Sequence, residues 1–129
     1  MNPLVVAGAI PVMNDRVILI RRGIEPARGL WTYPAGFVEM KETIAQAAVR
    51  EAKEETGFKI SARGLLGIYS YEDAGVVTIV YRADVIGGAA MLCKESMEIK
   101  EFTAKNIPWK SLAFRSTKDA LKDWVAGKK

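Results

Sequence analysis

Three glutamates lie within five residues of one another in the segment Arg50–Phe58, which reads REAKEETGF. The residues before it, from Thr43 onward, have the apolar spacing of a helix, which places Glu51 and Glu55 at the edge of the apolar stripe, with Glu54 beside them. Carboxylates in such a position repel one another and cost free energy unless they are paired or bound to a metal. The segment therefore calls for a cationic partner.

Two kinds of site meet that requirement. All the acidic side chains offer oxygen, and the chain contains no histidine, so a divalent-cation site would favour Mg²⁺ or Mn²⁺ over zinc. The alternative is a salt-bridge cluster, because Arg50 can reach Glu54 across one helical turn. The helical geometry favours the cation site and leaves the salt-bridge cluster open. Acid–base chemistry would have to use carboxylates, lysine, tyrosine or metal-bound water.

The wider spacing around these acids resembles the signature of the Nudix hydrolase family. From Gly36 to Phe58 the sequence GFVEMKETIAQAAVREAKEETGF fits the pattern G-x5-E-x7-R-E-U-x-E-E-x-G-U, in which U is apolar. Every fixed position matches, and nine specified positions in order leave little room for chance. The chain is identified as a member of this family on these residues.

The resemblance implies hydrolysis of a nucleoside diphosphate linked to another group X, by attack of water on phosphorus with the help of Mg²⁺, for which Mn²⁺ can substitute. Carried over by position, Glu51, Glu54 and Glu55 would bind the metal, with the backbone carbonyl of Ala35 as a further ligand. Glu54 and Glu55 would also take part in catalysis. Arg50 would orient the glutamates through hydrogen bonds.

Other acids and glycines have structural or less specific roles. Gly36 is expected to give a tight loop and Gly57 a left-handed helix end. Glu42 would bind metal through water or hold the loop to the helix, with the structural role slightly favoured. Family members often place another acid, a metal ligand or a catalytic base, after the motif. Glu98 matches that position best, ahead of Glu95, and a solvated strand end is an equal alternative.

Substrate contacts must come from outside this helix. Arg21, Arg22 and Arg28 flank the loop before it and are candidates for phosphate binding, although arginines at strand ends are common on surfaces. Several aromatic residues are candidates for stacking on a base, although aromatic residues in strands more often belong to the core. These are Trp31, Tyr33, Phe37, Tyr69 and Tyr71.

Two longer frames, RRGIEPARGLWTYPAGFVE and IPWKSLAFRST, are similar to the Nudix subgroup that acts on ADP-ribose, FAD or NADH. That subgroup commonly carries an N-terminal zinc ribbon, which this sequence lacks. ADP-ribose or a related dinucleotide is the leading substrate class. Two alternatives stay open: a nucleotide-pool sanitising enzyme that converts a noncanonical nucleoside triphosphate to the monophosphate, and a catalytically silent Nudix-fold nucleotide sensor.

The site must be positioned by a set of strands and by two helices. The first helix begins after Thr43, with Gln46 completing a capping box, and the second runs from Ser116 or Thr117 to Ala126. Strands are expected at 4–13, 16–22, 59–71, 76–86 and 98–103, with a turn at Asn14-Asp15 and a break at Gly87-Gly88. Mixed strands with two helices indicate an α/β or α+β sandwich. The resemblance implies an α/β/α sandwich with a mixed central sheet.

Composition sets the remaining limits. At 129 residues and 50% hydrophobic, residues 1–129 are expected to form a single domain. The lone cysteine, Cys93, excludes a disulfide framework and is expected to be a small buried hydrophobe. No apolar run reaches the roughly 18 residues that span a bilayer, so a cytoplasmic protein with no membrane partner is expected.

The expected partner is a small nucleotide. A net charge of +4 is only weak support for a polyanionic ligand. No basic tract with interleaved aromatic residues indicates a nucleic-acid groove, so no nucleic acid is expected. A homodimer is expected only by analogy with related enzymes.

Overall fold

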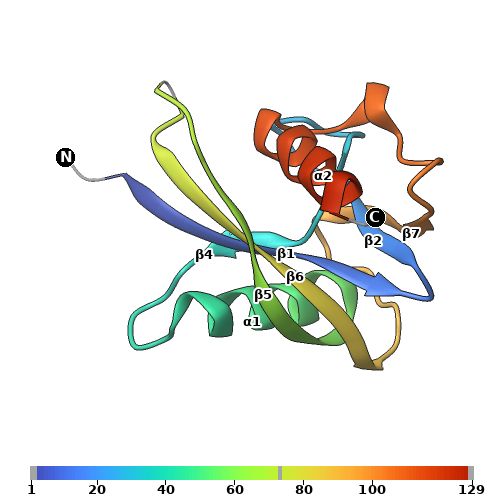
Figure 1. Ribbon diagram of the computed structural model, residues 1–129, viewed down its shortest axis with the longest axis horizontal. Helices are drawn as coiled ribbons and strands as arrows, with labels where there is room; N and C mark the ends of the chain where they lie inside the picture. Colours follow the sequence, from blue (N-terminus) through green and yellow to red (C-terminus); the bar gives the residue numbers. More distant parts are fainter. Residues whose placement is uncertain (1–2, 73, 128–129) are drawn as a thin grey trace.

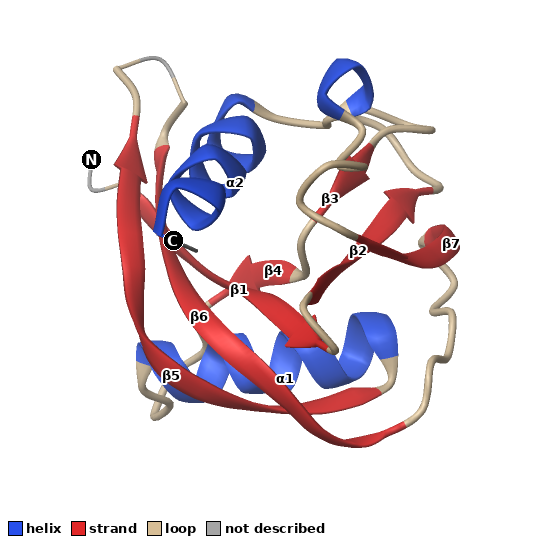
Figure 2. Cartoon of the chain, turned by 45° about the vertical axis from the view of Figure 1, so that its right-hand side comes forward, coloured by secondary structure: helices blue, strands red, loops and turns tan. Residues whose placement is uncertain are grey.

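The computed structural model describes residues 3–72 and 74–127, and within them seven strands form one mixed sheet between two helices. Helix α1 (Ile44–Thr56) covers one face of the sheet and helix α2 (Arg115–Gly127) the other (Figures 1 and 2). The predicted α/β/α sandwich is confirmed. No helix in the described part of the chain is long and apolar enough to span a bilayer.

The sheet is built around β1, which runs parallel to β6 and antiparallel to β2 and β4. Its main path is β3-β2-β1-β6-β5, with β4 paired to β1 and β7 paired to β2. The strands are β1 (Leu4–Met13), β2 (Arg16–Arg22), β3 (Trp31–Thr32), β4 (Ala35–Phe37), β5 (Phe58–Ser70), β6 (Val76–Gly88) and β7 (Ser96–Phe102). The turn between β1 and β2 is the predicted one, and Asn14 and Asp15 both have positive φ, as tight hairpin turns require.

Local sequence signals set both ends of α1. The Thr43 side chain accepts a hydrogen bond from the backbone N–H of Gln46 at 3.1 Å, and the Gln46 side chain accepts one from the Thr43 N–H at 2.9 Å. Gly57 then leaves the helix with φ of 82° and donates its N–H to the carbonyl of Lys53 at 3.0 Å. The capping box and the left-handed end are confirmed.

Two expectations about backbone and burial were wrong. Gly87 and Gly88 do not break a strand, because they pair with Lys59 and Phe58 and extend β6. Gly88 has φ of 80°, and a side chain there would meet the carbonyl of Gly57, so both the left-handed backbone and the close approach of two chain segments require glycine. Cys93 is only partly buried, because it lies in the loop before β7, with its sulfur 3.3 Å from the Ser96 hydroxyl.

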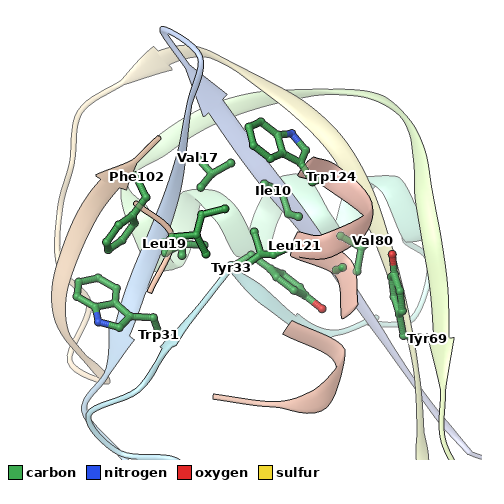
Figure 3. Close-up of a cluster of buried hydrophobic side chains, with 12 residues drawn as sticks. Ile10, Val17, Leu19, Trp31, Tyr33, Tyr69, Val80, Phe102, Leu121 and Trp124 are labelled. Atoms are coloured by element: carbon green, nitrogen blue, oxygen red, sulfur yellow. The ribbon is translucent and has the colours of Figure 1, made fainter. Parts of the chain in front are cut away.

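The two faces of the sheet have different cores. On the α2 face, large side chains such as Ile10, Val80 and Trp124 pack together, and Trp31 meets Phe102 edge to face (Figure 3). On the α1 face the contact is made mainly by alanines. They are Ala7, Ala9, Ala47, Ala48, Ala52 and Ala83. Small side chains on both partners let the helix lie close to the strands, which brings its acidic edge up to β4.

Candidate functional site

Two of the three glutamates of α1, Glu51 and Glu55, lie against β4. The Glu51 side chain keeps only 14% of its surface exposed, whereas Glu54 keeps 56%. Glu55 is partly buried, and one of its oxygens accepts a long hydrogen bond from the Ala35 N–H at 3.4 Å. The position of Glu51 and Glu55 at the edge of the apolar stripe is as the helical spacing predicts.

Arg50 links these acids to the loop before the helix. It donates to both oxygens of Glu42, at 2.8 and 3.0 Å, and to the Phe37 carbonyl at 3.1 Å. It also donates to Glu51 at 3.0 Å and to Glu54 at 3.1 Å. Hydrogen bonds from Arg50 lower the pKa of Glu42, and the same bonds raise the pKa of Arg50 above its ordinary value. Arg50 therefore makes hydrogen bonds to two of the glutamates, which are the contacts that its expected orienting role requires.

Glu42 holds the loop to the helix. Besides the two bonds from Arg50, one of its oxygens accepts the N–H of Glu39 at 2.9 Å. With these three bonds, Glu42 makes the contacts that its expected structural role requires. Both carboxylate oxygens are engaged by protein donors as the side chains lie here.

Gly36 does not form the tight loop that the sequence predicts. It belongs to β4, pairs with Ala7, and is not among the glycines with positive φ. A side chain added at Gly36 would collide with the carboxylate of Glu51. The glycine is needed because the Glu51 carboxylate lies directly against the β4 backbone, which is a close approach between residues fifteen positions apart in the sequence.

Glu55 is held in an unfavourable electrostatic position. Burial raises its pKa to about 10, with further contributions from the hydrogen bond to Glu51 and from the charge of Glu51. The Ala35 N–H acts in the opposite direction but does not offset them. A divalent cation between Glu51 and Glu55 would favour the ionised form of both.

The donor set fits a hard divalent cation by type. Glu51, Glu54, Glu55 and the Ala35 carbonyl supply only oxygen, which suits Mg²⁺ or Mn²⁺. In the described residues, no three acidic, histidine or cysteine side chains already converge on one point. Arg50 donates from one nitrogen to both Glu51 and Glu54 and so lies between their carboxylates.

A cavity of about 660 Å³ adjoins Glu55, whereas Arg50, Glu51 and Glu54 are not among the described residues that line it. Its wall includes six of the residues singled out from the sequence as metal, motif or substrate residues. They are Arg22, Tyr33, Ala35, Gly36, Phe37 and Glu55. Tyr69 and Tyr71, considered as stacking partners, also line it, whereas Trp31 belongs to the core. A cavity of this size accommodates a nucleotide.

The structure does not bring every candidate to this cavity. Arg21 donates to the Gly29 carbonyl at 2.8 Å and lies 3.8 Å from Glu98, its partner across β2 and β7. The Arg28 N–H lies 3.4 Å from a carboxylate oxygen of Glu25. Arg21, Arg28 and Glu98 are not among the described residues that line the cavity.

The sequence predicts no functional role for the residues at the start of α2, yet these residues form part of the cavity wall. Phe114, Arg115 and Ser116 line it, and all three lie in the frame IPWKSLAFRST. Tyr69 near the end of β5 and Tyr71 just after it are tied to α2 through carboxylates: Tyr71 donates to Asp119 at 2.5 Å and Tyr69 to Asp123 at 2.6 Å. Burial, and then these bonds, raise the pKa of both tyrosines, that of Tyr71 to about 12.

A usable signal for this contact was present in the sequence. Tyr69 and Tyr71 alternate on one face of a strand, and Asp119 and Asp123 are one helical turn apart, so each pair projects to one side. Which strand would face which helix was not deducible from that spacing.

Comparison with known proteins agrees with this geometry. A family model described as the NUDIX domain matches residues 2–125. The chain is 37% identical to an ADP-ribose pyrophosphatase of Methanocaldococcus jannaschii, over 99% of this chain and 76% of that protein. It is 31% identical to a MutT-like protein of Streptomyces ambofaciens, over 79% of this chain and 64% of that protein.

The fold comparison gives the same result. The crystal structure of a NUDIX hydrolase from Nitrosomonas europaea matches 99% of this chain and 73% of that chain, with a TM-score of 0.94 and 38% identity. The family model covers nearly the whole chain, and the signature positions coincide with the α1 site. The chain therefore belongs to the NUDIX domain family, and it is a Nudix hydrolase.

Proposed function

We propose that this Nudix hydrolase cleaves the pyrophosphate bond of ADP-ribose, or of a related dinucleotide such as FAD or NADH, in a Mg²⁺-dependent reaction in which Mn²⁺ can substitute. One observation carries the proposal: Glu55, on the carboxylate-rich edge of α1, lines a cavity of about 660 Å³ with aromatic walls. The similarity to a protein named ADP-ribose pyrophosphatase supports this substrate class.

In this proposal Glu51, Glu54, Glu55 and the Ala35 carbonyl hold the cation. Bound there, Mg²⁺ supplies neutralisation of the diphosphate oxygens and acidification of a water molecule. Arg50 holds Glu51 and Glu54 in place from one side, through the hydrogen bonds already described.

Glu54 and Glu55 are the proposed proton acceptors for the attacking water. Ionised carboxylates are competent general bases when they lie within hydrogen-bond reach of the water. Glu55 is the more buried of the two and lies on the cavity wall. Glu98 stays a weaker candidate, because it lies beside Arg21 on the β2–β7 pair and would need to approach the cavity from there.

The rest of the substrate would occupy the cavity. Arg22, Tyr33 and Phe37 are proposed to contact it, since all three line the wall next to the α1 site. Phe37 has 54% of its surface exposed, so its ring is available for stacking on a base. Tyr33 is buried at 2% exposure and serves better as part of the floor of the cavity. Arg21 and Arg28 stay predictions for phosphate contact.

The experiment is a screen of ADP-ribose, FAD, NADH, diadenosine polyphosphates and noncanonical nucleoside triphosphates with Mg²⁺, ranked by kcat/KM with products identified. Cleavage of ADP-ribose to AMP and ribose 5-phosphate supports the proposal. Release of inorganic pyrophosphate from a triphosphate as the preferred reaction supports the pool-sanitising alternative instead. Binding without turnover of any substrate would point to a nucleotide sensor.

Metal dependence is tested in the same assay. EDTA should abolish turnover, and Mg²⁺ or Mn²⁺ should restore it. Turnover that survives complete chelation would rule out the proposed cation site. A cytoplasmic location and a homodimer stay predictions from the sequence.

A further inference from the structure

Two arginines on the wall of the cavity are each held over an aromatic ring. The guanidinium carbon of Arg22 lies 5.0 Å from the centre of the Phe114 ring, and that of Arg115 lies 4.2 Å from the centre of the Tyr71 ring. All four residues line the cavity. An aromatic face restricts the positions of a long arginine side chain while its N–H donors stay free to meet a ligand.

Neither arginine is neutralised by a carboxylate. Within the described residues, no carboxylate oxygen lies within 4.0 Å of a guanidinium nitrogen of Arg22 or Arg115. Arg22 donates its Nε–H to the Pro26 carbonyl at 2.7 Å. Asp119, one helical turn after Arg115, already accepts the Tyr71 hydroxyl at 2.5 Å.

The cavity wall carries both signs of charge. Among the described residues that line it, Glu55 is the acidic side chain, and Arg22 and Arg115 are the cationic ones. In the proposed function the divalent cation beside Glu55 neutralises the scissile diphosphate. The two arginines, which no carboxylate of the protein pairs, are then available to a further anionic group on the substrate.

The walls of this cavity suit a nucleoside. Phe37, Tyr71 and Phe114 present aromatic surface, and Val6 and Val76 present aliphatic surface. Rings of a base stack on such walls, and apolar surroundings strengthen a charge-assisted hydrogen bond at the same place. An anion that reaches the arginines would accordingly be attached to the nucleoside half of the substrate.

We propose that Arg22 and Arg115 form a second anion subsite, which selects substrates that carry a phosphomonoester on the nucleoside, outside the scissile diphosphate. The proposal rests on the proposed function for the class of substrate. The planar fork of donors on arginine matches phosphate oxygens, and two such forks offer enough donors for one phosphate group.

Binding in the presence of EDTA tests this without turnover. AMP, adenosine 2′,5′-bisphosphate and adenosine 3′,5′-bisphosphate are titrated into the protein by isothermal calorimetry. At least one bisphosphate should bind about ten-fold or more tightly than AMP, as expected for charge-assisted hydrogen bonds to phosphate. The preference should fall as the salt concentration rises, because both arginines are partly exposed to solvent.

Substitutions identify the residues responsible. Arg22→Met and Arg115→Met should each move the affinities for AMP and the preferred bisphosphate toward equality. Arg22→Lys and Arg115→Lys should retain part of the preference, because lysine keeps the charge but loses the fork. The matched control is Arg16→Met, which removes the same charge from an exposed arginine paired with Glu101, away from the cavity. It should leave the preference unchanged.

Two results would overturn the subsite. One is equal affinity for AMP and both bisphosphates in the unaltered protein. The other is a loss of AMP affinity in the methionine variants that equals the loss for the bisphosphates, because the arginines would then serve the 5′-phosphate. Failure of the proposed function is separate: bisphosphate preference without ADP-ribose hydrolysis refutes the function, and hydrolysis without preference refutes the subsite.

Discussion

Replacing Glu55 by glutamine is expected to stabilise the chelated protein while removing catalysis. Glutamine has nearly the same shape as protonated glutamate and never ionises, so it removes the cost of keeping Glu55 protonated beside Glu51 without opening a cavity. The same change removes a proposed metal ligand and proton acceptor. Stability and activity should therefore move in opposite directions, which an ordinary structural glutamate would not produce.

The size of the effect follows from the raised pKa of Glu55. With a pKa near 10 in the fold and 4.5 as its ordinary value, the carboxyl keeps its proton at pH 7 in the chelated protein. Holding that proton costs about 1.4 kcal/mol per pH unit above 4.5, or roughly 3 kcal/mol at pH 7. Removing this cost stabilises the variant, but part of the gain is lost because glutamine cannot reproduce every hydrogen bond of the protonated glutamate. A gain of about 1–3 kcal/mol is expected, or several °C in Tm.

The sign of the pH dependence is fixed by the direction of the shift. A raised pKa gives a contribution to stability that is fully present below pH 4.5 and is lost as the pH rises toward 10. The difference between Glu55→Gln and the unaltered protein should accordingly be small near pH 4.5 and grow with pH.

Thermal unfolding is measured from pH 5 to 9 in EDTA and again with Mg²⁺. Mg²⁺ should raise the Tm of the unaltered protein and have much less effect on the variant, because a ligand stabilises only a fold that binds it. Glu72→Gln, at an exposed position, controls for the loss of one negative charge. A variant that is no more stable than the unaltered protein in EDTA at any pH, or that keeps Mg²⁺-dependent turnover, would refute this reasoning.

Three further substitutions test other parts of the site. Glu54→Gln should lower kcat by about 100-fold or more with little change in Tm, and undiminished turnover would remove Glu54 from the mechanism. Gly36→Ala should cost about 1–3 kcal/mol and weaken Mg²⁺ activation, because its new methyl group collides with Glu51; unchanged Mg²⁺ titration would contradict the close approach. Tyr71→Phe should cost about 1 kcal/mol by removing the bond to Asp119. The contribution of this hydrogen bond to stability is present below pH 10 and is lost as the pH rises through 12. If Tyr71→Phe and the unaltered protein lose stability in the same way above pH 10, this contribution is absent.

The predictions that needed only neighbours in the sequence were confirmed. The capping box at Thr43, the left-handed end at Gly57 and the turn at Asn14-Asp15 each depend on residues at most four positions apart. The hydrogen bond from Arg50 to Glu54 is of the same kind. Such interactions are determined by backbone geometry that the chain adopts locally, so spacing alone is sufficient to predict them.

The expectations that failed concerned contacts between distant segments. The sequence predicts a tight loop at Gly36, but the small size of this residue is needed because Glu51 packs against it from another element. The sequence predicts a break at Gly87 and Gly88, but both residues pair with β5 and belong to β6. Glycine at a turn and glycine at a close approach have the same letter in a sequence, and only the packing distinguishes them.

The sequence by itself determined the chemistry of this protein, because the acid spacing on α1 and the family signature both lie within 23 consecutive residues, Gly36 to Phe58. Only the tertiary structure decided what surrounds that chemistry. In the fold, the Tyr71 hydroxyl donates a hydrogen bond to Asp119, 48 positions away in the sequence. The guanidinium group of Arg22, near the N-terminus, lies over the ring of Phe114, near the C-terminus. The physical reason is that side chains of a cavity wall are brought together by the packing of α2 on the sheet, and no periodicity records which face of α2 meets which strand.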